Sequence, residues 1–498
     1  MISNIFPNSH SLSVKHVSSK NAALFTFVAS ILLSAIAHTG STLNRDGMLY
    51  VRAARAFLDG GIDAARALFN WPFLPILMAF VSRITGLDPE TSAHVLNSIF
   101  MAGACALMVA CIAKQTPENG WLAALVVLAI PGLNEYRNEL LREYGCWFFI
   151  MLSFWIALNW ENRPNWLVAF VSQIALGFAA LFRSEALAMF PALLAWQYFR
   201  SPKEERLHRL TSFSLLPAIV FITLLVLYLS GQLPESNRIA SDIGRLSIDR
   251  FNAKAAILAS ALLDYENVQP RTILFFGSLA LVPIKLAQKF GVFLIPILCV
   301  FATQPWRAAL SRFPLFTLGI VSHLLVLFAF VIDLQFLAGR YVGLILLLST
   351  PFVTNGLKWL MTSHPKWRTI FIAITVIMAL SNVVSFGQGK THHSEAGKWL
   401  AANTSESAEI YIDSGRTAYF ANWENVRLAP RNDRQAIKEA VAGKKYDLYV
   451  LEVSRKDPPI DDWLANNGLN VKQRFGIVSK DSLIIAEPND KSLLRAKK

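Results

Sequence analysis

The feature that most constrains this chain is a series of apolar runs, the first over residues 22–40 and the last over residues 369–387. A run of about 20 apolar residues is the length of a helix that crosses the hydrocarbon core of a bilayer. The chain is 54% hydrophobic and only 16% charged, whereas soluble domains carry about 25% charged residues. The sequence therefore predicts an all-α polytopic membrane protein.

We expect about eleven spans, and the apolar piece 272–287 is either interfacial or a twelfth span. The predicted spans are residues 22–40, 93–113, 121–133, 144–160, 166–182, 186–199, 211–230, 289–304, 314–332, 341–358 and 369–387. Lys15 and Lys20 precede the first span, and lysine and arginine recur in the segments 200–209, 305–312 and 358–368. Cytoplasmic loops carry such an excess of basic residues, so the pattern predicts a cytoplasmic N-terminus.

The net charge of +13 does not indicate nucleic-acid binding, because the basic residues cluster in short loops where membrane orientation explains them. The four cysteines lie within or at the edges of apolar runs and show no metal-ligand spacing or plausible disulfide. The first apolar run lacks a convincing cleavage site, so we interpret it as a retained anchor.

Beyond residue 387 the composition changes, because charges become frequent and of mixed sign. Short strands are predicted at 409–415, 447–453 and 481–487, with helices near 394–403 and 433–443 between them. Strands that alternate with helices indicate a small α/β domain. We therefore predict a transmembrane domain over 1–387 and a soluble domain over 388–498, on the side of the membrane opposite the basic loops. No internal repeat is visible, so the inverted-repeat pattern of many transporters is missing.

The first outer segment places Arg45 and Asp46 directly after the first span. Residues 45–59 and 71–86 have the pattern of helices that lie in the membrane interface. Two interpretations of Asp46 stay open at this point. Asp46 either caps the interfacial helix, a position that aspartate favours, or it belongs to a functional site.

The second outer segment, 134–145, holds Glu135, Glu139 and Glu143, with Arg142 beside them. On a helix this i, i+4, i+8 spacing would place the three carboxylates on one face. Charges at a membrane edge are costly and indicate function by default. The alternative is a solvated loop with ordinary charges.

Two further turns carry charge on the same predicted side. Arg183 and Glu185 interrupt about 30 apolar residues, and Arg340 with Tyr341 opens a late span. A simple hairpin with local charges, or a snorkelling anchor, would also explain them. If these turns converge, their arginines suit a phosphate, which guanidinium groups can bind bidentately, and a carboxylate among them suits a general base.

Taken in order, these motifs resemble the GT-C membrane glycosyltransferases, of the glycosyltransferase family 39-like type. They are RDGMLY with Asp46, the acidic outer segment, R-x-E before a run with Pro191, and the late RY span. Similar bacterial members are the protein O-mannosyltransferase relatives and the lipid A aminoarabinose transferase. The resemblance implies 11 to 13 transmembrane helices, interfacial helices in the first outer loop, and a donor sugar linked to polyprenyl phosphate.

The resemblance also implies roles for single residues. Asp46 would be the general base of an inverting transfer, with Glu143 or Glu139 as the second acidic site. The candidates for binding the donor phosphate are Arg183, Arg340, Arg45, Arg142 and Tyr341. The candidates for binding the substrate are Tyr50 and Glu185. No cofactor and no metal are expected, and the His392–His393 doublet is expected to be solvated.

The expected place of action is the periplasmic face of a bacterial inner membrane, among membrane lipids. The acceptor stays open between lipid A, a polysaccharide and a protein, and the sugar is not identified. Two alternatives remain: a transporter or flippase, for which the best charges near mid-span are His323 and Asp333, and a noncatalytic component of envelope polysaccharide assembly.

Overall fold

The computed structural model describes most of the chain. It covers residues 9–39, 42–160, 166–230, 248–262, 269–384, 391–404, 408–423, 426–431, 433–455, 457, 459–477 and 481–489. The chain divides into two compact units: Met1–Ala37 with Ala53–Val384, and His38–Arg52 with Ser385–Lys498. The predicted boundary between residues 387 and 388 lies outside the described residues and stays a prediction.

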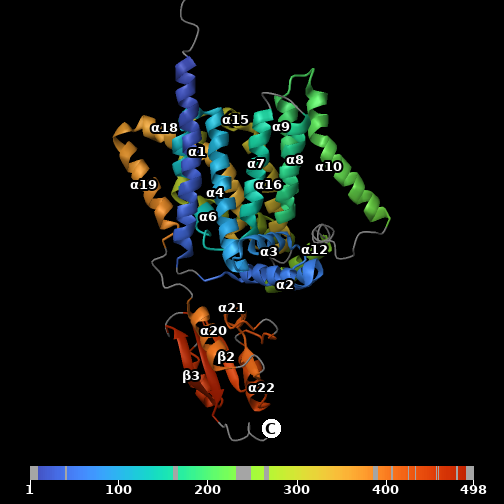
Figure 1. Ribbon diagram of the computed structural model, residues 1–498, viewed down its shortest axis with the longest axis vertical. Coiled ribbons are helices and arrows are strands. Elements are labelled where there is room, and N and C mark those ends of the chain that lie inside the picture. Colours follow the sequence, from blue (N-terminus) through green and yellow to red (C-terminus); the bar gives the residue numbers. More distant parts are fainter. Residues whose placement is uncertain are drawn as a thin grey trace, which may run out of the picture. The chain divides into compact units, whose positions relative to one another are not determined.

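The first unit is helical (Figure 1), and a helix stands at the place of each predicted span. Its helices in the first 200 residues are α1 (Ser9–His38), α2 (Arg45–Leu68), α3 (Phe73–Thr85), α4 (Pro89–Gln115), η1 (Pro117–Asn119), α5 (Gly120–Ala129), α6 (Pro131–Asn134), α7 (Arg142–Trp160), α8 (Trp166–Phe182), η2 (Ser184–Ala188) and α9 (Met189–Arg200). The later helices are α10 (Arg206–Leu229), α12 (Ile248–Ala261), α13 (Pro270–Phe290), η3 (Gly291–Phe293), α14 (Leu294–Thr303), α15 (Trp306–Ser311), α16 (Pro314–Leu334), η4 (Gly339–Val342), α17 (Gly343–Leu348), α18 (Thr350–Ser363), η5 (Pro365–Trp367) and α19 (Arg368–Ser381).

Several of these helices can cross a membrane by length and composition. Among the described residues, five apolar segments are long enough, and a sixth appears if α17 and α18, bent by 63° at their junction, count as one span. The five segments are Lys20–His38, Pro89–Gln115, Arg206–Leu227, Pro270–Thr303 and Pro314–Leu334. Helices at other predicted spans, such as α5 and α9, are shorter. The chain is thus a membrane protein, and its exact number of crossings stays a prediction.

Close packing holds α4, α7 and α8 together, and small residues allow it. Gly103 of α4 lies against Phe148, and Gly145 of α7 lies against Phe182, so that a Cβ at either glycine would overlap the ring. Small residues at helix crossings are typical of membrane bundles, since they let backbones approach closely. The contact at Gly145 also fixes the end of α8 beside the first turn of α7.

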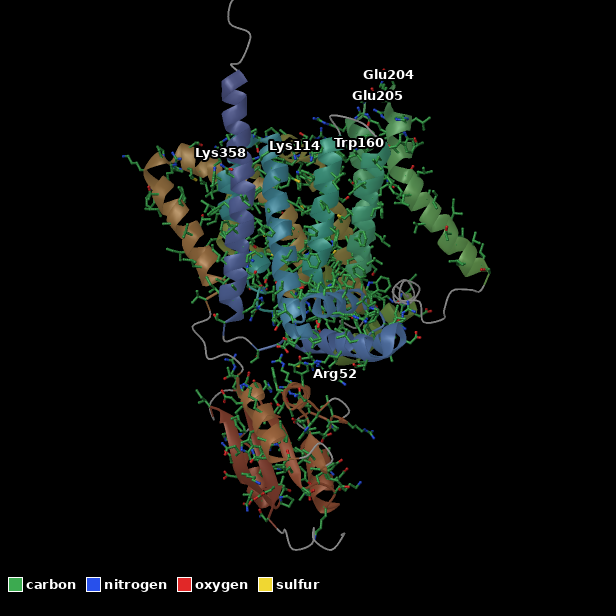
Figure 2. The ribbon with its side chains drawn as sticks, viewed as in Figure 1. Arg52, Lys114, Trp160, Glu204, Glu205 and Lys358 are labelled. Atoms are coloured by element: carbon green, nitrogen blue, oxygen red, sulfur yellow. The ribbon has the colours of Figure 1, made fainter. Side chains whose placement is uncertain are left out.

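The basic segments of the first unit share one end. Figure 2 shows Lys114, Trp160, Lys358 and the pair Glu204–Glu205 there, at the end of α7 that carries Trp160. This common end is what the positive-inside pattern predicted. Which side of the membrane it faces stays a prediction.

The opposite end carries the crosswise helices. In Figure 1, α3 lies across the ends of the long helices, as expected of an interfacial segment, and it packs on α4 and α8. The Trp71 indole before α3 donates to the carbonyl of Leu181, 2.6 Å away. Asp88 caps α4 by accepting from the backbone N–H groups of residues 90 and 91, which satisfies donors that a helix start leaves unpaired.

The second unit contains a four-stranded sheet in the order β1-β2-β4-β3, with β1 and β2 parallel and the other pairs antiparallel. Its elements are α20 (Thr391–Asn403), β1 (Ile410–Ile412), α21 (Gly415–Phe420), α22 (Arg434–Ala442), β2 (Leu448–Val453), α23 (Asp461–Asn466), β3 (Leu469–Gly476) and β4 (Ser482–Pro488). The three predicted strands are confirmed. The edge strand β3 was missed, because its central residues are charged or polar and exposed.

Both faces of this sheet are buried by helices. Ile412, Val450 and Ile485 pack with α20 and α21, whereas Tyr449 and Ile484 pack with α22 and α23 on the other face. Successive residues of a strand point to opposite faces, so a sheet covered on both sides needs apolar residues in unbroken runs. This explains the near-continuous apolar sequences of β2 and β4.

Candidate active site

The candidate site forms around one buried carboxylate, Glu143, in the first turn of α7. The Glu143 side chain is only 5% exposed and forms an ion pair with Arg183. Arg340 approaches the same carboxylate oxygen, with its Nε 3.6 Å from Oε1. One carboxylate is therefore shared by two guanidinium groups that come from distant parts of the sequence.

Arg183 has a second acidic partner, Glu185, in the short helix η2. Burial opposes ionisation of Glu185, but the charge and hydrogen bonds of Arg183 outweigh it and lower the Glu185 pKa to about 2. Burial likewise opposes the charged form of Arg183, but the two glutamates raise its pKa. Both side chains are thus held in their charged forms.

Tyr341 is the aromatic centre of this cluster. Its ring lies under both guanidinium groups, with Cζ of Arg183 at 4.9 Å and Cζ of Arg340 at 5.5 Å from the ring centroid. Cations attract the face of an aromatic ring at such distances. On another side, the Tyr341 ring meets the edge of Phe330 at 5.1 Å, and its backbone oxygen lies 3.3 Å from Nε2 of the buried His323.

The local fold explains why these residues converge. Arg183 directly follows the last residue of α8, Glu143 stands one position after the start of α7, and η4 carries Arg340 and Tyr341. These positions lie at the end of the bundle opposite Trp160, because Trp160 ends the helix that Glu143 begins (Figure 2). The sequence predicted that these turns share one side, and the structure brings Glu143, Arg183, Glu185, Arg340 and Tyr341 into contact.

A lysine that the sequence analysis missed lies beside this cluster. Lys289, near the end of α13, forms an ion pair with Glu135 and lies 5.3 Å from the ring centroid of Tyr136. Gly339, the residue before Arg340, packs so closely against Lys289 and Tyr136 that a Cβ there would overlap both. The only signal in the sequence was two lysines, Lys285 and Lys289, near the junction of two apolar runs, which is ordinary at the end of a span.

The prediction that Glu135, Glu139 and Glu143 share a helical face is wrong. Helix α6 ends at Asn134, residues 135–141 are not helical, and α7 begins at Arg142. Glu135 consequently reaches Lys289, and Glu143 reaches the two arginines. The half-buried Glu139 lies in a turn, where its N–H donates to the carbonyl of Tyr136 at 2.8 Å. Separate cationic partners relieve the repulsion that a shared face would cause.

Two arginines of this segment stabilise neighbouring helices. Arg142 donates to the carbonyl of Phe182 at 3.4 Å, at the end of α8, and lies over the ring of Phe69. Arg137, which the sequence analysis did not single out, is 2% exposed. Its guanidinium donates to Asn134 Oδ1 and to Ser30 and Ser34 of α1 at 2.7–3.0 Å. Arg137 thereby ties α1 to the turn that leads into the site.

Three candidate residues lie elsewhere, in the part of α2 that groups with the second unit. Arg45 is exposed, Asp46 is half-buried and Tyr50 is buried. Asp46 is the second residue of α2 and lies in its first turn, so the interpretation of Asp46 as the N-cap is wrong. Asp46 and Tyr50 are four residues apart and thus share one face of the helix.

The expectation that His392 and His393 are solvated is also wrong, because they are 6% and 1% exposed in the second unit. Their position at the start of α20, which packs on the sheet, buries them. Within the part of the chain that the structure describes, no group of three or more His, Cys, Asp and Glu side chains is placed to hold a metal ion.

No protein-family model and no curated protein sequence matches this chain. Among solved structures, ArnT from Cupriavidus metallidurans bound to undecaprenyl phosphate aligns with a TM-score of 0.55 and 12% sequence identity, over 94% of this chain and 98% of that chain. ArnT from the same organism in the apo state aligns with a TM-score of 0.41 and 11% identity, over 95% of this chain and 98% of that chain. The first alignment shows that the chain shares the fold of this ArnT structure, which confirms the predicted fold class.

Proposed function

We propose that this chain is an integral-membrane glycosyltransferase that moves a sugar from a polyprenyl-phosphate donor to an envelope acceptor. The observation that carries the proposal is the convergence of Arg183 and Arg340 on one buried carboxylate. The ArnT-like fold supports the same function, because the aligned structure is bound to undecaprenyl phosphate. The acceptor is lipid A, a polysaccharide or a protein.

The charge change of the reaction suits two arginines. A sugar linked through one phosphate is a phosphodiester with a single negative charge, and the departing lipid phosphate gains a second one. Hydrogen bonds that strengthen as this charge develops lower the barrier of the transfer step. The side chains of Arg183 and Arg340 are 16% and 23% exposed, so both guanidinium groups can reach a ligand. The ring of Tyr341 lies under both guanidinium groups and holds them beside each other.

The carboxylates beside the arginines then act as positioning groups. Glu185 has a pKa of about 2 and is ionised at neutral pH, so it cannot donate a proton there. It orients Arg183, and Glu143 holds Arg183 and Arg340 on the same carboxylate. Glu139 is a further acidic residue that contacts the substrate.

Asp46 is the proposed general base. It takes the proton of an acceptor hydroxyl, whose oxygen attacks the anomeric carbon as the bond to the lipid phosphate breaks. The products are the glycosylated acceptor with inverted configuration, the free lipid phosphate and protonated Asp46. Tyr50, one helical turn later, contacts the substrate, and Arg45 and Arg142 add positive charge for the phosphate. This role rests on the resemblance of RDGMLY to the family motif and on the position of Asp46 after the first span.

The proposed place of action is the periplasmic face of a bacterial inner membrane, with the N-terminus in the cytoplasm and the second unit in the periplasm. The common basic end of the first unit supports this orientation. A transporter or flippase is the alternative. A transporter or flippase would move its substrate across the membrane of proteoliposomes without forming any glycosidic product.

The test compares Asp46→Asn with Asp59→Asn, a loss of the same charge at an exposed position of the same helix. Each variant is returned to a deletion strain, and the envelope glycans and lipids are analysed by mass spectrometry. We expect one sugar modification to disappear in the deletion strain, return with Asp59→Asn and stay absent with Asp46→Asn. Normal modification by a well-expressed Asp46→Asn variant would contradict the assignment of the base.

A further inference from the structure

A cavity outside the candidate site lies between α12 and the end of α16. It has a volume of about 550 Å³ and is lined by Arg250, Ala253, Lys254, Asp333 and Leu334. The three residues of α12 are spaced i, i+3 and i+4, so they share one face of that helix. The lining carries two cations and one carboxylate, so its net charge at neutral pH is positive.

Lys254 is held in place at this cavity. It is half-buried, and its ammonium donates a hydrogen bond to the backbone carbonyl of Asp333 in the last turn of α16. The C-terminal end of a helix attracts a cation, so this contact stabilises both helices. An ammonium has three donors, and two of them remain for a ligand in the cavity.

Arg250 stands one helical turn before Lys254 and is exposed. No ion pair or hydrogen bond of its side chain occurs within the described part of the chain. A lysine fixed on a carbonyl and an arginine open to a ligand form a pair that matches a phosphate, since guanidinium groups bind phosphate oxygens through two parallel hydrogen bonds.

The surroundings indicate a lipid rather than a soluble anion. Ile257 is placed one further turn along the same face of α12 and is 71% exposed. Leu334, the last residue of α16, is 42% exposed, and Phe336 beyond it is 59% exposed. Figure 1 shows α12 at the end of the first unit that also holds α3. Basic residues followed by exposed apolar residues on one helix face are typical of a helix that lies among lipid headgroups.

We infer that the cavity between α12 and α16 is a binding site for the headgroup of a bilayer phospholipid. Arg250 and Lys254 bind its phosphate, and the exposed apolar side chains of Ile257, Leu334 and Phe336 contact its acyl chains. The carboxylate of Asp333 repels a bare phosphate, so it favours headgroups that carry a hydroxyl or an ammonium group. This site is distinct from the Arg183 and Arg340 cluster and does not depend on the proposed reaction.

The test measures lipid retention on the purified full-length protein by native mass spectrometry, with palmitoyl-oleoyl phosphatidylglycerol as the probe. Arg250→Gln removes one charge-assisted contact, so we expect the affinity to fall about tenfold. Ala253→Trp fills the cavity while both cations remain, and we expect it to abolish the retained lipid. The matched control is Arg271→Gln, which removes an exposed arginine at the start of α13 and should change the affinity by less than about twofold.

Four results would overturn the inference. The first is wild-type retention by both Arg250→Gln and Ala253→Trp. The second is an equal loss in Arg271→Gln, which would mean general attraction of charge and not a site. The third and fourth come from competition experiments. Displacement of the lipid by glycerol phosphate at equal concentration would indicate a soluble-anion site. Stronger displacement by undecaprenyl phosphate than by phosphatidylglycerol would assign the cavity to the donor.

Discussion

Each of the two units contains a buried polar cluster, and the two clusters differ in kind. In the first unit, Glu143, Arg183, Glu185 and Arg340 bring four formal charges together from three separate segments. In the second unit, Nδ1 of His393 lies 3.2 Å from Ser414 Oγ and 3.3 Å from Thr417 Oγ1, with Glu452 3.8 Å from its Nε2. The comparison shows that polarity and burial alone do not indicate function.

The cluster of the second unit has the residue types of a nucleophilic triad, a serine, a histidine and a carboxylate. However, Ser414 and Thr417 are 0% exposed and His393 is 1% exposed, so no substrate reaches the hydroxyl groups. Ser414 also caps α21 by accepting from the N–H of Thr417. This cluster therefore stabilises the fold, whereas the arginines of the first unit retain exposure and charge.

The largest expected difference between the clusters is in activity. Arg183→Gln and Arg340→Gln each remove a proposed donor to the developing phosphate charge, and such losses cost about 10²–10³-fold in rate. His393→Ala in the second unit should leave the rate within about threefold, since its side chain contacts no substrate. The readout is the amount of sugar-modified envelope product per expressed protein. Arg83→Gln, an exposed arginine of α3, is the control for general loss of charge.

A smaller effect is expected in stability. Glu143→Gln leaves Arg183 and Arg340 near each other without their shared carboxylate, and loss of one partner of a buried ion pair costs about 3 kcal/mol. The midpoint of thermal unfolding, Tm, of the detergent-purified protein should therefore fall clearly below that of the wild type. An unchanged Tm would mean that the cluster is solvated and not held by its charges.

The acid dependence of stability sharpens the same point. The folded pKa of Glu185 is about 2, below its ordinary value of 4.5, so the stability from its charge is present above the ordinary pKa and is lost as the pH falls toward 2. We expect the Tm of the wild type to fall more steeply than that of Glu185→Gln from about pH 5 downward. Parallel Tm curves for the two proteins would contradict the low pKa.

The smallest effect belongs to the second unit. Ser414→Ala removes the cap of α21, and such a loss costs about 1 kcal/mol. Hydrogen exchange of the α21 amides, followed by mass spectrometry on the full chain, should become faster while transfer activity is unchanged. A loss of transfer without faster exchange would mean that the hydroxyl cluster has a chemical role after all.

Much of the fold could be predicted from the sequence. Apolar length placed the helices, and apolar runs flanked by turn residues placed β1, β2 and β4, because these elements bury surface that is visible in the sequence. The edge strand β3 buries little, so its pattern was not visible.

The candidate site was predicted only in part, since the partners of its charges come from distant segments. The sequence indicated Glu143, Arg183 and Arg340 but not that the two arginines share the carboxylate of Glu143. The predicted common face of the three glutamates was wrong, because the helix breaks after Asn134. Lys289 and Arg137 were missed because each is a single cation whose partners are set by tertiary packing.

The central claim is that the arginine pair beside Glu143 binds the lipid phosphate of the sugar donor. Its most direct test is the affinity of the purified protein for undecaprenyl phosphate, measured for the wild type, Arg183→Gln, Arg340→Gln and the control Arg83→Gln. We expect each of the first two variants to bind at least about tenfold more weakly, the loss typical of one charge-assisted hydrogen bond, and the control to bind like the wild type. Wild-type affinity in both Arg183→Gln and Arg340→Gln would contradict the account.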